Sequence, residues 1–353
     1  MLFLTLTLSL LGCRGDACEP VEVGGRQASL QATLDACLSA SLTPGALIAV
    51  HDGQETWTAA TGLADVDADL PMTPDAVFRG GSTTKIYTAA LVLELVDRGR
   101  LSLDDPLARW APDFPDADRI TVRHLLNQTG GVADYMDTEL LAEERRALWT
   151  PERLLEAGAS ISPLDEVGGG FHYANTNYIA LGLIIEAVTG RRYHEHLRET
   201  LLDPLALSSV ALDGFEPLRA PLVRGYTESD GWVDIGDRNH PTVTWSAAGL
   251  TSDIADLARW GHLLFTWHVL APDQIAAMAT PPTADGYPYG FGVTLYETPV
   301  GPAIGQKGRT AGHFSWLGYF PDLDLTVATY SNTSEDFGDP RPAAWAAVAL
   351  FSR

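Results

Sequence analysis

The sequence predicts an α+β fold in which one antiparallel sheet is built from both ends of the chain and flanked by helices. Two strand patterns, 46–50 and 57–62, lie near the N-terminus, and three more, 289–296, 314–320 and 323–331, lie near the C-terminus. Between them, from about residue 100 to 260, the patterns are mostly helical, with Pro and Gly punctuation. We therefore expect a sheet lobe, a mainly helical inserted lobe and a cleft between the two.

The N-terminal elements follow from hydrophobic periodicity. Residues 27–42 place apolar side chains at helical spacing, which predicts an amphipathic helix. The runs 46–50 and 57–62 flank the turn Asp52-Gly53 and indicate a hairpin. Residues 86–96 are apolar at helical spacing, and Gly99 marks the end of that helix.

Further helices are expected along the inserted lobe and at the C-terminus. Thr121 and Asp253 are placed to begin two of them, and Gly190 to end another. A turn at Pro321-Asp322 should join the last two strands as a hairpin. The predicted helices are 122–127, 178–188, 254–265 and 343–351.

Composition excludes several classes of function. The chain has 353 residues, 46% hydrophobic and 20% charged, as is ordinary for a soluble globular protein. Its net charge of −23 argues against nucleic acid or an anionic membrane surface as partner. No Cys/His spacing is typical of zinc, and we expect neither a metal nor another cofactor.

The N-terminal residues predict export. Residues 2–11 are apolar, too short to span a bilayer but similar to the core of an export signal. The following Leu-x-Gly-Cys resembles a bacterial lipobox, so we expect Cys13 to carry a lipid anchor in the periplasm or cell envelope. A plain secretory signal is the alternative. Cys18 and Cys37 then form an even pair, which indicates one disulfide, with two buried free thiols as the alternative.

Phe78-Arg79-Gly80-Gly81-Ser82-Thr83-Thr84-Lys85 carries the candidate nucleophile. Positions three apart share a helix face, so the Lys85 amine should reach the Ser82 hydroxyl. Burial and the positive end of the helix dipole favour a neutral amine, which can accept the hydroxyl proton. The alternative is that Ser82 only caps the helix and Lys85 is a solvated surface residue.

Two further stretches support the nucleophile. In Tyr173-Ala174-Asn175, an extended backbone would point Tyr173 and Asn175 to one side. A phenol near an ammonium should have a lowered pKa and could shuttle protons, and an amide could hold a substrate carbonyl. The alternative is a core tyrosine beside a helix-capping asparagine.

The other stretch, Gly305-Gln306-Lys307-Gly308-Arg309-Thr310-Ala311-Gly312, enters a strand, where glycines would let a substrate approach the sheet edge. Lys307 should then point away from the face that Gln306 occupies. His124 to Gly131 is interpreted as a structural turn that supports the cleft.

In this order and spacing, from about residue 44 to 332, the chain resembles the serine β-lactamase-like family. That family includes class C β-lactamases, D-alanyl-D-alanine carboxypeptidases, D-aminopeptidases and family VIII esterases. The resemblance implies that Ser82 is acylated, that Lys85 activates it and that Tyr173 is a second proton-transfer group. It also implies that Asn175 orients the substrate and that the backbone N–H groups of Ser82 and Arg309 form an oxyanion hole.

The departure lies in the third motif, Gln306-Lys307-Gly308, where the family usually has Lys or His, then Thr or Ser, then Gly. Gln306 carries no charge to support a substrate carboxylate. We therefore expect a serine hydrolase of carboxypeptidase or esterase type that cleaves a small amide or ester, with a D-amino-acid cell-wall peptide as one candidate. The alternative is a penicillin-binding-like envelope protein that uses the cleft only for binding.

We expect an export leader and tether at 1–25 and a hydrolase domain at 26–353. Within it, the sheet lobe takes about 26–80 plus 285–353 and the helical lobe about 100–260.

Overall fold

The computed structural model of the protein describes residues 18–40, 43–282 and 286–352. Seven of the described strands form one antiparallel sheet in the order β3-β2-β1-β12-β11-β10-β9, so strands from both chain ends lie side by side. This arrangement confirms the predicted fold class. The strands are β1 (Gly45–His51), β2 (Thr56–Asp65), β3 (Leu70–Pro71), β9 (Thr294–Thr298), β10 (Gly301–Thr310), β11 (His313–Phe320) and β12 (Leu325–Ser331).

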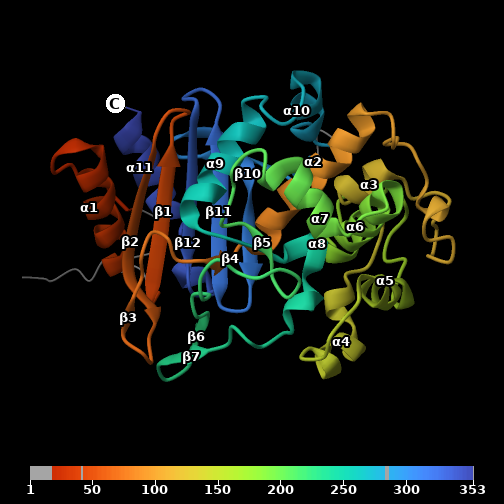
Figure 1. The fold of residues 1–353 in the computed structure, drawn as a ribbon, viewed down its shortest axis with the longest axis horizontal. Helices are drawn as coiled ribbons and strands as arrows, with labels where there is room; N and C mark the ends of the chain where they lie inside the picture. The colour runs from red at the N-terminus through yellow and green to blue at the C-terminus, as the bar shows by residue number, and fades with distance from the viewer. Residues whose placement is uncertain (1–17, 41–42, 283–285, 353) are drawn as a thin grey trace, which may run out of the picture.

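The centre of the sheet is apolar on both faces because helices cover both. Alternate residues of β1 belong to different cores: Leu47 and Ala49 pack in the layer that contains the helices α2 and α9, whereas Ile48 and Val50 pack with α1 and α11. Figure 1 shows α1 and α11 on one side of the sheet and the helical lobe on the other. The covering helices are α1 (Gly25–Ala40), α2 (Thr84–Asp97), α9 (Ile254–Phe265) and α11 (Arg341–Phe351).

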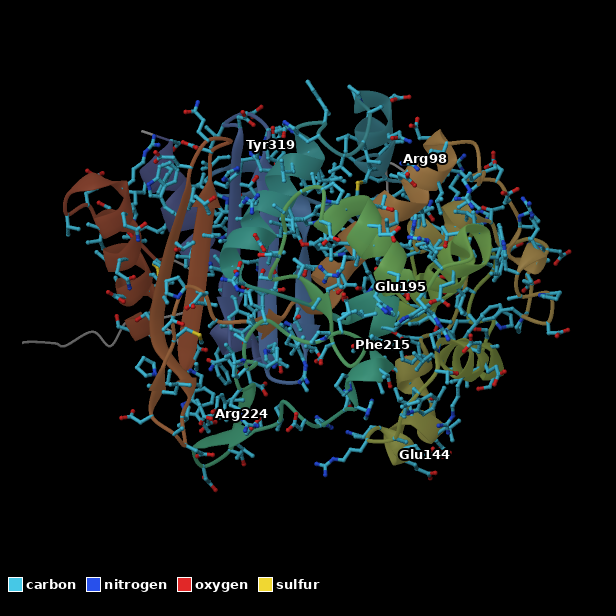
Figure 2. The ribbon with its side chains drawn as sticks, in the orientation of Figure 1. Arg98, Glu144, Glu195, Phe215, Arg224 and Tyr319 are labelled. Carbon is cyan, nitrogen blue, oxygen red and sulfur yellow. A yellow bond between two sulfur atoms is a disulfide. The ribbon has the colours of Figure 1, made fainter. Side chains whose placement is uncertain are left out.

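The inserted lobe is mainly helical, with short strands where it meets the sheet lobe. Its helices are α3 (Val122–Leu126), α4 (Glu139–Glu144), α5 (Pro151–Ser160), α6 (Asn175–Thr189), α7 (Tyr193–Leu197) and α8 (Trp245–Ala248), and α10 (Pro272–Met278) follows α9. Its strands are β5 (Ala211–Leu212), β6 (Tyr226–Glu228), β7 (Trp232–Asp234) and β8 (Leu250–Ser252), and β8 pairs with both β5 and β4 (Phe78–Arg79). Charged side chains such as Glu144 and Arg224 lie at the periphery (Figure 2).

Most elements lie where hydrophobic periodicity placed them, and three differ. The segment 301–310 is a complete strand, β10, whereas the sequence predicted only that residues 305–312 enter a strand. The predicted strand 289–296 is a turn up to Val293, and β9 begins only at Thr294. Helix α6 begins at Asn175, so the segment with Tyr173 and Asn175 is not one extended run; Ala174 is its last extended residue.

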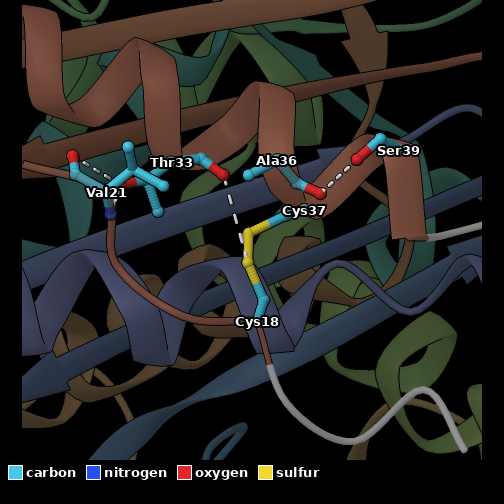
Figure 3. Close-up of a disulfide and its surroundings, with 6 residues drawn as sticks. All are labelled: Cys18, Val21, Thr33, Ala36, Cys37 and Ser39. Atoms are coloured by element: carbon cyan, nitrogen blue, oxygen red, sulfur yellow. Dashed lines mark hydrogen bonds between the residues drawn. A yellow bond between two sulfur atoms is a disulfide. The ribbon is translucent and has the colours of Figure 1, made fainter. Parts of the chain in front are cut away.

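A disulfide ties the N-terminal segment to α1. Cys18 and Cys37 are bonded, with their Cα atoms 5.4 Å apart, as predicted (Figure 3). Cys13, the expected lipid-bearing residue, lies outside the described residues. Within the described ranges, no helix has both the length and the apolar character that crossing a membrane requires.

Candidate active site

Ser82 lies at the junction between the sheet lobe and the helical lobe. It is the middle residue of a short 3-10 helix, Gly81–Thr83, that leads directly into α2. Gly81 has φ +57°, and a Cβ there would lie 2.8 Å from the backbone nitrogen of Arg309. The glycine therefore lets the turn before Ser82 press against strand β10.

The Ser82 hydroxyl lies between an amine and a phenol. Its Oγ is 3.0 Å from the Nζ of Lys85 and 2.8 Å from the phenolic oxygen of Tyr173. Ser82 is half-buried and lines a cavity, whereas the Lys85 side chain is fully buried behind it. The sequence spacing correctly predicted that Lys85 would reach Ser82, and the structure adds Tyr173 on the other side.

The Lys85 amine has three hydrogen-bond acceptors. Besides Ser82 it donates to the Asn175 Oδ1 at 2.7 Å and to the Ala247 carbonyl of α8 at 2.9 Å. Burial lowers the pKa of Lys85 to about 7, although the carboxylate of Asp134 acts in the opposite direction. The predicted shift towards the neutral amine is confirmed.

The expected lowering of the Tyr173 pKa is wrong. Burial, reinforced by the neighbouring Tyr289 phenol, raises the pKa of Tyr173 well above its usual range, against the lowering effect of its hydrogen bond to Ser82. Desolvation outweighs any attraction to Lys85, whose charge is itself suppressed. Tyr173 is therefore a neutral phenol, able to donate a hydrogen bond and to pass on a proton.

Gln128 holds the loop that carries Tyr173. Its backbone carbonyl accepts from the N–H of His172 at 2.8 Å, and its side-chain oxygen accepts from the N–H of Ala174 at 3.0 Å. Gln128 thus fixes both neighbours of Tyr173, His172 through its backbone and Ala174 through its side chain. Gln128 is fully buried and has φ +64°. The interpretation of 124–131 as a structural turn agrees with this contact, although Gln128 itself was not predicted.

Asp134 orients the Asn175 side chain. One carboxylate oxygen accepts from the Nδ2 of Asn175 at 2.8 Å and from its backbone N–H at 3.1 Å. Because Asn175 Nδ2 donates to Asp134, its oxygen is turned towards Lys85. Burial raises the pKa of Asp134, while the N–H donors of Met136 and Asn175 lower it. The sequence analysis missed Asp134, since only the fold brings it next to Asn175.

Strand β10 packs against the turn before Ser82. Strand β9 pairs with β10 only from Gly301 to Gly305, so among the described strands nothing pairs with that edge of β10 beyond Gly305. The main chain at Gly80 and Gly81 lies there instead, and a Cβ at Gly308 would lie 1.8 Å from the Gly80 carbonyl oxygen. The expectation that this glycine admits a substrate is thus wrong; it admits the protein's own backbone.

The side chains of the third motif divide between the two faces of the sheet. Gln306 lies opposite Leu317 on the site face, and Lys307 lies opposite Trp316 on the other face, as predicted. The buried Gln306 amide donates to the Tyr289 phenol at 3.1 Å and to a backbone carbonyl at 3.4 Å. No formal charge therefore faces the site from this position.

The Arg309 side chain is held by two other residues. Its guanidinium donates to Asp336 at 2.5 Å and lies 4.2 Å from the centre of the Phe314 ring.

Both Ser82 and Arg309 line a cavity of about 470 Å³. The other lining residues are Phe171, Tyr173, Asn175, Tyr287, Tyr289, Thr294, Gln306 and Lys307. In the part of the chain that the structure describes, no group of three or more His, Cys, Asp or Glu residues could hold a metal ion.

Comparison with known proteins agrees with this geometry. The Beta-lactamase family model matches residues 30–350. Penicillin-binding protein 4 of Amycolatopsis lactamdurans is 28% identical over 333 residues, which cover 86% of this chain and 84% of that protein. Esterase EstB of Burkholderia gladioli is 31% identical over 223 residues, which cover 54% of each chain.

The structural comparison reaches the same result. The D-amino acid amidase of Ochrobactrum anthropi SV3, solved in complex with L-phenylalanine amide, has a TM-score of 0.82 and 25% identity to this chain. The similarity covers 93% of this chain and 98% of the amidase. Because the family model matches nearly the whole length of this chain, the chain belongs to the Beta-lactamase family and is a serine hydrolase.

Proposed function

We propose that the protein is an exported enzyme that hydrolyses a small, uncharged amide or ester through an acyl-enzyme on Ser82. The observation that carries the proposal is the position of the Ser82 hydroxyl, 3.0 Å from the Lys85 amine and 2.8 Å from the Tyr173 phenol. A hydroxyl with a base on one side and a proton donor on the other is the arrangement that acyl transfer requires.

Acylation begins with the neutral form of Lys85. Two of its hydrogens stay with Asn175 and the Ala247 carbonyl, which leaves the nitrogen lone pair for the Ser82 proton. The Ser82 Oγ then bonds to the substrate carbonyl carbon as its proton moves to Lys85. When the bond to the leaving amine or alcohol breaks, that group takes the Tyr173 proton, and the proton on Lys85 replaces it.

Deacylation uses the same groups. Water attacks the acyl carbon and gives a proton to Lys85, and Ser82 leaves with a proton returned from the amine. The backbone N–H groups of Ser82 and Arg309, both on the cavity wall, stabilise the oxyanion in each step. Loss of one such donor typically costs about 10²–10³ in turnover.

The walls of the cavity favour an uncharged substrate. A substrate carboxylate must lose water in the cleft, which costs several kcal/mol unless charge or hydrogen bonds compensate for it. The Gln306 amide is already bonded to Tyr289, and the Arg309 guanidinium is bonded to Asp336. The similarity to an esterase and to a D-amino acid amidase supports esters and amides as the substrate class.

Export is proposed from the N-terminal sequence and the disulfide. The apolar run 2–11 and Cys13 indicate a leader with a lipid anchor, which places the mature enzyme in the periplasm or cell envelope. The Cys18–Cys37 bond supports an oxidising compartment. The leader and tether would then take residues 1–25 and the hydrolase domain 26–353.

The test compares diethyl succinate with monoethyl succinate, which differ by one free carboxylate, using acid release at constant pH. We expect wild type to prefer the diester, Gln306→Lys to reduce that preference, and Ser82→Ala to be inactive on both. If Ser82→Ala retains wild-type turnover, the nucleophile is wrong. If wild type prefers the monoester, the substrate class is wrong.

A further inference from the structure

Three aromatic rings form one wall of the cavity in front of Ser82. The Phe171 ring stacks on the Tyr287 ring with their centroids 4.7 Å apart and their planes 18° apart. The Tyr289 ring lies 5.3 Å from Phe171 and 6.0 Å from Tyr173. The rings come from two separate segments, the loop before α6 and the segment before β9, and they meet only in the fold.

The wall is uncharged, in a strongly acidic protein. The chain has 46 Asp and Glu residues, yet none is among the described residues that line this cavity. Of the two cationic lining residues, Arg309 binds Asp336, and Lys307 is exposed to solvent on the strand β10 rather than part of the aromatic wall. A ligand group beside the rings would therefore meet apolar surface.

The ring arrangement favours a planar apolar group over a cation. Cations bind over ring faces, and best inside a box of several rings. Here Phe171 and Tyr287 are nearly parallel and stacked on one another, so each covers one face of the other, and the two rings do not enclose a cation as a box would. The amine of Lys85 also lies directly behind Ser82 and repels a second cation whenever it is protonated.

We propose that Phe171, Tyr287 and Tyr289 form a subsite for an aryl or similarly large apolar group of the substrate, next to the bond that Ser82 attacks. This inference rests on the proposed hydrolysis and names its substrate class: arylalkyl esters and amides. Burial of such a group and its stacking against the wall should raise kcat/KM on the order of 10-fold.

The kinetic test uses ethyl acetate, ethyl phenylacetate and benzyl acetate, which place a phenyl ring on neither side, the acyl side or the leaving side. We expect wild type to prefer one of the two phenyl esters by about 10-fold. Phe171→Ala and Tyr287→Ala should each reduce that ratio several-fold, and Tyr287→Phe should keep it. Phe215→Ala is the matched control, because Phe215 is a surface ring in the helical lobe that does not line the cavity (Figure 2).

Three results would overturn the subsite. The first is equal kcat/KM on all three esters, and the second is a kcat/KM that the alanine variants lower by the same factor on each ester. The third is a preference for the ethyl ester of betaine, which carries a trimethylammonium group. A binding measurement separates this proposal from the hydrolysis itself. Ser82→Ala protein, titrated calorimetrically, should bind phenylacetamide more tightly than acetamide. Equal affinities would contradict the subsite while leaving the role of Ser82 intact.

Discussion

The pKa of Lys85 is the single-residue property on which the proposed chemistry depends. Burial lowers this pKa to about 7, whereas the Asp134 carboxylate acts to raise it. Because the neutral amine is the base, kcat/KM should rise as pH increases through about 7 and then level off. A protein with an ordinary lysine pKa would still be inactive at neutral pH.

Asp134→Asn should change this profile in a defined direction. Removing the carboxylate removes the influence that raises the Lys85 pKa, so the inflection should move below pH 7. The plateau should also fall by roughly 10- to 100-fold, because a neutral amide oxygen is a weaker acceptor than the carboxylate and holds the Asn175 amide less firmly. Initial rates between pH 5 and 9 measure both effects.

Asp118→Asn, at an exposed acid of the helical lobe, is the control and should reproduce the wild-type profile. An unchanged inflection in Asp134→Asn would show that Asp134 does not act on Lys85.

The sequence predicted the contacts of single residues correctly where the partners lie close together in the chain. Ser82 and Lys85 are three residues apart, so helix geometry alone brings them together. Asp134 and Gln128 could not be predicted, because their partners lie 41 and 46 residues away and meet them only in the fold. The Tyr173 pKa was mispredicted for the same reason: burial and Tyr289, both tertiary features, determine its direction.

Among the contacts between elements, the close packing of β10 on the turn before Ser82 is the one that positions the site. Gly308→Ala would place a Cβ 1.8 Å from the Gly80 carbonyl oxygen, and backbone on both sides must move to avoid it. We expect a loss of about 1–3 kcal/mol in stability and a larger fractional loss in kcat/KM, since the oxyanion donors shift. Chemical denaturation and ester hydrolysis measure the two effects.

Gly170→Ala is a suitable control for stability, because no atom lies within 4 Å of its added Cβ. If Gly308→Ala unfolds at the same denaturant concentration as wild type and retains its activity, the contact does not position the site.

Element boundaries were predicted well where periodicity is strong and missed where tertiary contacts set them. Residues 254–265 form α9 with its Asp253 cap as expected. Strand β10 was predicted only from residue 305 onward, because the glycines and polar residues of this segment break alternation, and its pairing with β11 supplies the order. Helix α6 begins three residues before its apolar pattern, where Asp134 accepts the Asn175 N–H.

Over the whole molecule, buried histidines couple stability to pH. His313 lies on central strand β11, fully buried, and burial together with Arg79 lowers its pKa to about 3. The unfolded chain, with a histidine pKa near 6.5, binds this proton more readily than the folded one. The contribution of His313 to stability is therefore fully present above about pH 6.5 and is lost as pH falls towards 3, by up to ~1.4 kcal/mol per pH unit.

Urea denaturation of wild type and His313→Gln between pH 7.5 and 5.0 measures this coupling. As pH falls, the free energy of unfolding of wild type should decrease more steeply than that of the variant. The difference between the two slopes should correspond to the uptake of about one additional proton on unfolding. His51 and His262, whose pKa values are also lowered by burial, should contribute equally to both proteins. Identical slopes would mean that His313 does not titrate in the unfolding reaction.

The proposed hydrolysis depends on one covalent bond at Ser82, which intact-mass spectrometry after incubation with a fluorophosphonate tests most directly. The predicted result is one adduct per chain at pH 8, mapped to Ser82, absent from Ser82→Ala and formed more slowly as pH falls below 7. An adduct that maps to another residue, or that forms at the wild-type rate in Ser82→Ala, would contradict the account.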